Sequence, residues 1–449
     1  MSYLSLSDDD KKQMLAAIGI GSTEELFGCL PRNIRLHRDL ALPAPLAELE
    51  LVRELEATGG RNAYSRFLSF LGGGAYDHYI PTVVDYLSAR GEFVSPYTPY
   101  QPEVSQGTLQ IIFEFQTLVC QLTGLDIANA SLYEGATGAA EAVLMAHRLT
   151  GRPKVLVCRT VHPQYREVIR TYIRNLGLQA VDVPYGKDGR VDTPVLAGLL
   201  DDAVCGLVYQ SPNFFGVIED VKALSEAAHA RKALSIAVVA EALSLGLLEA
   251  PSKLGADIVT GEMQSFGIPL SFGGPYLGFM ACRKEFVRQL PGRITGQTTD
   301  VEGRRGFVLT LATREQHIRR EKATSNICTN QALCALRATI FLESLGGQGL
   351  RDMAWQNVQK AAYAMDVLTA VPGVRRKFGG PHWNEFVLEL PKPWAKVDAA
   401  LREEKGILGG IGIEASYPEL RNSVLVCVTE LKRKEDIDRA GRALREAVS

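Results

Sequence analysis

Between residues 130 and 282, short apolar stretches alternate with stretches that have the periodicity of amphipathic helices. The apolar stretches include "KVLVC" at 154–158, "VCGLVYQ" at 204–210 and "LSIAVVA" at 234–240. Strands this uniformly apolar are buried on both faces, as they are in parallel sheets that helices cover. The pattern therefore predicts an α/β fold with a large, mainly parallel sheet, in which ligands bind beyond the carboxyl ends of the strands.

The length of 449 residues exceeds what one hydrophobic core usually serves, so two or more domains are expected. We predict a helical N-terminal segment at 1–60, a large α/β domain at 61–320 and a smaller C-terminal α+β domain at 321–449. Residues 70–107 are rich in Gly, Pro and Tyr, which predicts a long irregular surface of the kind that often lines functional sites.

Composition excludes several classes of function. The net charge is −2 at pH 7, so the chain provides no basic field for nucleic acid. Its apolar runs are far shorter than the roughly 20 residues of a membrane helix, and its polar start does not resemble a secretion signal. The eight cysteines include no CxxC pair, which predicts reduced thiols and no metal site. We therefore expect a cytoplasmic protein that binds neither nucleic acid nor membranes.

A turn of small residues, "YEGATGAAEA" at 133–142, opens directly into a predicted helix. Gly135, Thr137 and Gly138 lie in this turn, where the glycines would let a phosphate approach the free N–H groups and the positive end of the helix dipole. The spacing fits neither a P-loop nor a dinucleotide fingerprint. The alternative is a tight helix start that packs on the sheet.

Two polar residues follow predicted strands. His162 comes after "KVLVC" and could stack on a flat aromatic cofactor or exchange protons, or it could be an ordinary loop residue. Glu241 comes after "LSIAVVA" and could pair with a pyridinium nitrogen, or it could satisfy the N-terminus of the next helix. Both positions belong to the predicted carboxyl edge of the sheet.

A polar and basic segment, "RREKATSNICTNQ" at 319–331, marks the start of the predicted C-terminal domain. It combines cations with Thr324, Ser325 and Asn326. Such a segment could hold a phosphate, or it could be a solvated hinge between domains.

Several long stretches of the chain resemble one family. They include "FLGGGAYDHYIP", "YTPYQPEVSQG", "YEGATGAAEA", "GADIVTGEMQSFGIPLSFGGPYLGFMACR" and "REKATSNICTNQAL". These stretches are similar to the N-terminal half of the glycine decarboxylase P-proteins of the glycine cleavage system. The length of the chain and its end at residue 449 match the split form of that family, in which two separate chains make up the protein and this one resembles subunit 1.

The resemblance implies the fold type I architecture of pyridoxal-phosphate enzymes, with a sheet of the seven-stranded type. It also implies a reaction in which glycine is decarboxylated and its aminomethyl group passes to the lipoyl arm of the H-protein. The lysine that binds the cofactor lies in the other half of the family's sequence. Aligned with that lysine loop, "GEMQSFGIP" places Gln264 where the lysine would stand, and an amide cannot form the imine.

The same alignment assigns inherited positions to the residues singled out above. Glu241 stands near the acid that faces the pyridinium, His162 near the residue that stacks on the ring, and Gly135 and Thr137 at the phosphate turn. With Gln264 they form a vestigial site, so no catalytic residue is expected in this chain alone. Pyridoxal phosphate is expected on a partner, subunit 2, with two copies of each chain in a heterotetramer.

In this fold each subunit of a pair lends residues to the other's cofactor site. The predicted contributors are hydrogen-bonding residues in or beside irregular backbone, and they are Tyr97, Thr98, Tyr100, Gln106, Thr324, Ser325 and Asn326. The Arg-rich stretch 304–320 has a rival role, because it could guide an acidic H-protein by charge.

Three alternatives stay open at this point. The chain could be a scaffold that only stabilises a catalytic subunit. It could be an independent pyridoxal-phosphate enzyme that uses Lys253 or Lys284, the lysines nearest to the loop. The parallel sheet alone would also fit a dinucleotide-binding dehydrogenase, but the glycine fingerprint after the first strand is missing.

Overall fold

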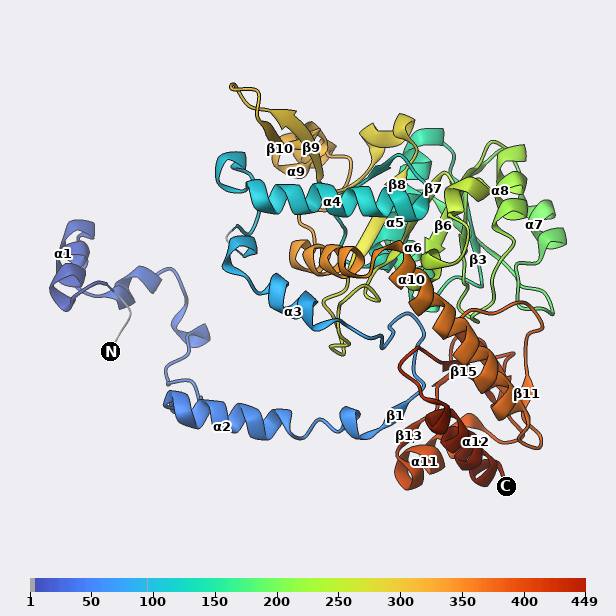
Figure 1. Cartoon of the computed structure of the whole chain (residues 1–449). Helices are drawn as coiled ribbons and strands as arrows, with labels where there is room; N and C mark the ends of the chain where they lie inside the picture. Colours follow the sequence, from blue (N-terminus) through green and yellow to red (C-terminus); the bar gives the residue numbers. More distant parts are fainter. Residues whose placement is uncertain (1–4, 95) are drawn as a thin grey trace. The chain divides into compact units, whose positions relative to one another are not determined.

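A computed structural model describes residues 5–94 and 96–449, and the chain forms two compact units, Met1–Tyr64 and Ser65–Ser449 (Figure 1). The N-terminal unit has two helices, α1 (Asp8–Ile18) and α2 (Glu48–Gly59), joined by short 3-10 turns. None of its described residues is buried. Its large apolar side chains, among them Met14, Phe27 and Leu55, are exposed instead, so the described part of this unit has no hydrophobic core of its own.

The second unit is built on a seven-stranded sheet with the order β2-β8-β7-β6-β5-β3-β4. The run from β7 to β4 is parallel, whereas β8 is antiparallel to both of its neighbours, so the predicted α/β fold with a large, mainly parallel sheet is confirmed. The strands are β2 (Ile127–Ala128), β3 (Lys154–Cys158), β4 (Gln179–Val183), β5 (Val204–Gln210), β6 (Leu234–Val239), β7 (Ile258–Glu262) and β8 (Gly278–Cys282).

Helices pack against this sheet and bury its apolar strands. The most deeply buried is α5 (Gly135–Thr150), whose first turns consist almost wholly of small residues, so that it lies close to β5, β7 and β8. Four other helices also contact strands of the main sheet: α4 (Gln106–Thr123), α6 (Pro163–Ile173), α7 (Thr193–Leu199) and α8 (Val221–Ala230). Gly124 ends α4 in the left-handed conformation with φ 73°, which is a common helix stop.

The C-terminal part of the chain forms a smaller antiparallel sheet with its own apolar cluster. Its order is β11-β12-β15-β14, and the long helix α10 connects it to the main sheet and contacts both α4 and α12 (Figure 1). The non-helical residue Gly346, with φ 61°, breaks α10 into two helices. The elements are α10 (Ala332–Thr369), β11 (Arg375–Arg376), β12 (Glu385–Glu389), α11 (Trp394–Lys405), β14 (Ile411–Gly412), β15 (Ser423–Cys427) and α12 (Lys434–Val448).

Two shorter pairings complete the unit. Strand β1 (Leu68–Ser69) pairs in parallel with β13 (Ile407–Leu408), which ties the start of the unit to its C-terminal part. From there the chain passes through the segment that precedes α3 (Thr82–Ser88). Strands β9 (Ile294–Thr299) and β10 (Arg305–Thr310) form a hairpin, followed by the short helix α9 (Gln316–Arg319). Among the described residues, no helix has the length and apolar character needed to cross a membrane.

Candidate functional site

Three of the predicted site residues lie at the carboxyl edge of the parallel strands. His162 follows β3, Glu241 follows β6 and Gln264 follows β7. They are 8 %, 2 % and 2 % exposed, so all three are buried. The segment Gly72–Tyr79, here called the crossing segment, runs over this edge and hydrogen-bonds to each of them.

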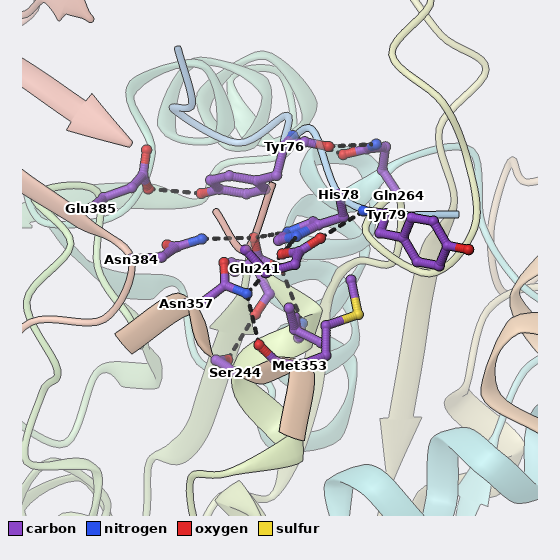
Figure 2. A network of polar contacts seen from close by, with 12 residues as sticks. Tyr76, His78, Tyr79, Glu241, Ser244, Gln264, Met353, Asn357, Asn384 and Glu385 are labelled. Carbon is purple, nitrogen blue, oxygen red and sulfur yellow. Dashed lines mark hydrogen bonds and ion pairs between the residues drawn. The ribbon is translucent and has the colours of Figure 1, made fainter. Parts of the chain in front are cut away.

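Both polar atoms of the Gln264 side chain are hydrogen-bonded to the backbone of Tyr76. Its Oε1 accepts a hydrogen bond from the Tyr76 N–H at 2.8 Å, and its Nε2 donates to the Tyr76 carbonyl at 3.0 Å (Figure 2). Nε2 also donates to the carbonyl of Ile268 at 2.6 Å. Because both ends of the amide are bound within the chain, Gln264 fastens the crossing segment to the loop that follows β7.

Glu241 is paired with a histidine of the crossing segment. Nε2 of His78 donates to Oε2 of Glu241 at 2.9 Å, and Nδ1 donates to Oε2 of Glu430 at 2.8 Å. Both ring nitrogens face carboxylates, so both carry a proton and the ring is an imidazolium. Asn384 donates to the same oxygen of Glu241 at 3.3 Å (Figure 2).

The pKa values follow from this arrangement. Burial by itself would lower the pKa of His78, but the charges and hydrogen bonds of Glu241 and Glu430 raise it to about 10. For Glu430, burial acts to raise the pKa, and the hydrogen bond and charge of His78 outweigh it, so the pKa is lowered. Buried charges are retained only when they are paired and hydrogen-bonded, and that condition is met here.

His162 is held as a neutral ring. Its Nε2 donates to the carbonyl of Gly73 at 2.7 Å, while its Nδ1 accepts from the N–H of Gln164 at 3.2 Å. Burial lowers its pKa, which agrees with the neutral form. His162 packs edge to face against the ring of Phe214. A Cβ added to Gly74 would lie 3.1 Å from the imidazole, so the crossing segment passes directly over the ring.

A second carboxylate holds the start of the crossing segment. Glu385 on β12 accepts from the N–H of Gly73 at 2.6 Å and from the hydroxyl of Tyr76 at 2.8 Å. Burial raises the pKa of Glu385 to about 7, although these hydrogen bonds oppose the shift. A Cβ on Gly72 would come within 2.3 Å of Glu385 Oε1 and 2.5 Å of Cys427 Cβ, so only glycine fits at that position.

The start of α5, predicted to resemble a phosphate turn, is occupied by carboxylates of the chain itself. Glu262 accepts from the N–H of Gly135 at 3.1 Å, and Glu134 accepts from the N–H of Thr137 at 2.8 Å. Burial raises the pKa of Glu262 to about 7, against the effect of its backbone donors. A Cβ on Gly135 would lie 2.2 Å from the hydroxyl of Tyr165, so the glycine serves close packing.

These residues do not fit a pyridoxal phosphate held by this chain. Gln264 offers no amine, and Glu241 already has a cationic partner in His78. The N–H groups at the start of α5 donate to carboxylates, which would repel a phosphate. Sequence reasoning placed His162, Glu241 and Gln264 at the edge of the sheet but missed Tyr76 and His78, which bind two of them there, although both lie in the Gly-rich stretch that it singled out.

The residues predicted to reach a partner lie on a different part of the unit. Tyr97 is 85 % exposed, and Tyr100 is also exposed, whereas Thr98 is half-buried. Gln106 is not free, because its side chain pairs with both backbone groups of Phe307 on β10, at 2.8 Å and 2.9 Å. The structure therefore leaves the tyrosines accessible and uses Gln106 to join α4 to the hairpin.

Thr324, Ser325 and Asn326 form a stretch of partly exposed backbone before α10. The Thr324 N–H donates to the Arg314 carbonyl at 3.0 Å, and Ser325 Oγ accepts from a backbone N–H two residues later. Asn326 is exposed and accepts from the Gln316 amide at 3.0 Å.

Arg293 connects Tyr100 of the first predicted group to Cys328 and Asn330, just after the second group, although no sequence motif pointed to it. The residue is buried, and it donates to the Cys328 carbonyl at 2.7 Å and to Asn330 Oδ1 at 2.9 Å. Its guanidinium also lies over the ring of Tyr100, 5.7 Å from the ring centre. Tyr100 and the residues that follow Asn326 are thereby held on one face of the unit.

The Arg-rich stretch is only partly available for a partner. Arg304 at the hairpin tip pairs with Asp300 and Glu302, and Arg314 is buried and donates to backbone carbonyls. Arg319 and Arg320 are exposed.

The two lysines proposed as alternative cofactor ligands are both exposed. Lys253 pairs with Glu249 at 3.0 Å, and Lys284 lies in a 3-10 turn after β8. Neither belongs to the buried edge of the sheet. In the described part of the chain the eight cysteines are free, and no group of side chains has the makeup of a metal site.

Comparison with known proteins gives consistent results over the whole chain. Residues 1–444 match the family model described as the glycine cleavage system P-protein. The chain is 53 % identical over 445 residues to a protein of Moorella thermoacetica named probable glycine dehydrogenase (decarboxylating) subunit 1, with 99 % of each chain covered. A protein of Geobacillus thermodenitrificans with the same name is 52 % identical, with 97 % of each covered.

Solved structures agree with these relatives. The structure matches a crystal structure of glycine decarboxylase (P-protein) of the glycine cleavage system, in inhibitor-bound form, with a TM-score of 0.90, 46 % identity and 100 % coverage of both chains. A glutamate decarboxylase of Lactobacillus brevis matches with a TM-score of 0.69 at 13 % identity, covering 94 % and 97 % of the chains, and shows the fold alone. The predicted fold type I architecture is confirmed by these neighbours.

Proposed function

This chain belongs to the glycine cleavage system P-protein family, and from that premise we propose that it is the subunit of a two-chain glycine decarboxylase that holds no cofactor of its own. The observation that carries the proposal is the side-chain amide of Gln264, which aligns with the family's cofactor-binding lysine and whose two ends are hydrogen-bonded to the backbone of Tyr76. The relatives named subunit 1 have the same length range as this chain, which supports a separate second subunit.

The proposed reaction is the decarboxylation of glycine with transfer of the aminomethyl group to the lipoyl arm of an H-protein. Pyridoxal phosphate in the partner subunit would supply the electron sink when carbon dioxide leaves. The contribution of this chain is to position and enclose that site, because His162, Glu241 and Gln264 at its own sheet edge are each held by hydrogen bonds within the chain. We further propose two copies of each subunit and a cytoplasmic location.

A second subunit is also favoured by exposed apolar surface. Residues 5–64 expose a series of large apolar side chains and bury none, and a segment without a core is ordered by packing on something else. In the second unit, Tyr86, Val94, Tyr97 and Val104 are exposed around α3 and the start of α4. Apolar and tyrosine-rich surface of this kind is typical of subunit interfaces.

The residues proposed to reach the partner's cofactor lie in or beside the two segments that Arg293 joins. They comprise Tyr97, Thr98 and Tyr100 on one side and Thr324, Ser325 and Asn326 on the other, with Gln106 in a supporting place at the base of the hairpin. Neutral donors suit a site where a carboxylate substrate and a phosphate must be oriented without a competing proton transfer.

The test is co-expression of this chain with a candidate subunit 2. The mass of the purified complex gives the stoichiometry, and glycine–bicarbonate exchange gives the activity. We expect exchange from the complex and none from either chain alone. A cofactor bound covalently to this chain, or full exchange by subunit 2 without it, would contradict the proposal.

A further inference from the structure

The crossing segment hydrogen-bonds to residues that follow three different strands of the sheet. The carbonyl of Gly73 accepts a hydrogen bond from His162. The backbone of Tyr76 meets Gln264, and the ring of His78 meets Glu241 (Figure 2). One short segment therefore occupies three positions that belong to three different strand ends. These are the positions at which ligands bind in open α/β sheets.

His78 meets Glu241 through a single charged N–H donor. A carboxylate after a strand end can hold a pyridinium through one charged N–H donor. Nε2 of His78 presents such a donor to Glu241 at 2.9 Å. Both side chains are 2–3 % exposed, so the pair is shielded from water.

The second ring nitrogen of His78 also has a carboxylate partner, and that carboxylate is itself hydrogen-bonded. Glu430 takes its second nitrogen at 2.8 Å, and Asn357 and the N–H of Tyr79 donate to that carboxylate at 2.8 Å and 2.6 Å. Lys360 donates to the Glu430 carbonyl. Tyr76, Glu385 and Cys427 also lie near the pair. Burial raises the pKa of each of them, and the hydroxyl of Tyr76 donates to Glu385 at 2.8 Å.

We propose that the crossing segment is an internal substitute for the cofactor, with the imidazolium of His78 in the place of the pyridinium opposite Glu241. The segment thereby stabilises the sheet edge and excludes pyridoxal phosphate from this chain. Exclusion does not depend on Gln264 alone. Restoring a lysine at position 264 therefore does not restore a cofactor site.

The first experiment uses the full chain with Gln264→Lys. The purified variant is incubated with pyridoxal 5′-phosphate, reduced with borohydride and mapped by peptide mass. We expect no adduct at position 264, while the exposed Lys253 and Lys284 react as surface lysines do. Saturable labelling at position 264 would overturn the proposal.

The second experiment measures the His78–Glu241 pair directly and does not depend on the first. Unfolding by urea is measured for the wild type, His78→Gln, Glu241→Gln and the double variant. We expect His78→Gln to raise the unfolding constant about tenfold more in the wild type than in the Glu241→Gln background, as expected for a coupled pair. Additive effects would contradict the proposed pairing.

A matched control tests whether the coupling is specific to His78 or follows from the loss of any histidine. The ring of His147 hydrogen-bonds to the Arg152 carbonyl at 2.9 Å, and His147→Gln is expected to be additive with Glu241→Gln. Both experiments read out binding and stability of this chain. An absence of glycine–bicarbonate exchange in the assembled complex would reject the proposed function and leave this inference unaffected.

Discussion

The backbone of Tyr76 satisfies both ends of the Gln264 side chain, with its N–H 2.8 Å from Oε1 and its carbonyl 3.0 Å from Nε2. Gln264 is a structural residue in this arrangement, since its amide holds two parts of the chain together across the sheet edge. Under the proposed function, the absence of a lysine here does not mark a damaged active site, because the edge of the sheet has a buried, hydrogen-bonded structure of its own.

Gly72→Ala should destabilise the chain strongly. The added Cβ would meet Glu385 Oε1 at 2.3 Å and Cys427 Cβ at 2.5 Å, and overpacking of this kind costs about 1–3 kcal/mol or more. Urea unfolding of the purified chain measures the effect. Gly91→Ala is the control, because a Cβ there meets nothing within 4 Å. Equal stability of the two variants would show that the crossing segment is not packed as described.

The stability of the chain should depend on the protonation of Glu385. Its pKa is raised to about 7 in the folded chain, against a value near 4.5 for an ordinary glutamate. The folded state therefore binds the proton more tightly, so this contribution is complete below about pH 4.5 and is lost as the pH rises through about 7.

Glu385→Gln should flatten this pH dependence by ~1–3 kcal/mol, because the amide stays neutral throughout. Unfolding free energies at pH 5 and pH 8 measure the difference. Glu262 and Glu219 also have pKa values raised to about 7 by burial, so part of the wild-type slope should persist in the variant. An unchanged slope would mean that Glu385 is already ionised at pH 5.

Arg293→Lys should loosen the face that carries the proposed partner-contacting residues. The guanidinium bonds to both the Cys328 carbonyl and Asn330 and covers the ring of Tyr100, and a lysine cannot make this forked contact. We expect a loss of ~2–4 kcal/mol in unfolding free energy, as for a buried charge that loses its partners. Hydrogen exchange at residues 324–330 should rise in step, and unchanged exchange would contradict the role assigned to Arg293.

Thr98→Ala and Asn326→Ala should each lower the turnover of the assembled complex about tenfold or more, with little change in its melting temperature, if these side chains position groups in the partner's site. Gln348→Ala, on the exposed side of α10, is the control. Normal kinetics in both variants would favour the alternative that this chain is only a scaffold.

Binding of an H-protein should depend on salt if the exposed arginines guide it. Arg319→Gln with Arg320→Gln should weaken binding and reduce its dependence on ionic strength, because surface charges act over about 8–10 Å at physiological salt. Arg304→Gln should have little effect, since Arg304 is already paired with Asp300 and Glu302. Titration calorimetry at two salt concentrations distinguishes these outcomes, and identical salt slopes would remove the steering role.

The sequence by itself determined the class of fold and the family. The mainly apolar strands β5 and β8 are buried along their whole length. Burial selects apolar residues position by position, so such a run can be recognised from the sequence alone. His162, Glu241 and Gln264 could be placed at the edge of the sheet for the same reason, because each directly follows such a strand.

Only the tertiary structure decided what fills that edge. His78 lies 163 positions from Glu241 and 352 from Glu430 in the sequence, and Tyr76 lies 188 from Gln264. Hydrogen bonds across such separations leave no periodic pattern, and a glycine-rich loop has no preferred path until its partners surround it. The sequence could therefore place His162, Glu241 and Gln264 at the edge of the sheet, whereas only the fold shows that the chain's own backbone and the ring of His78 hydrogen-bond to them there.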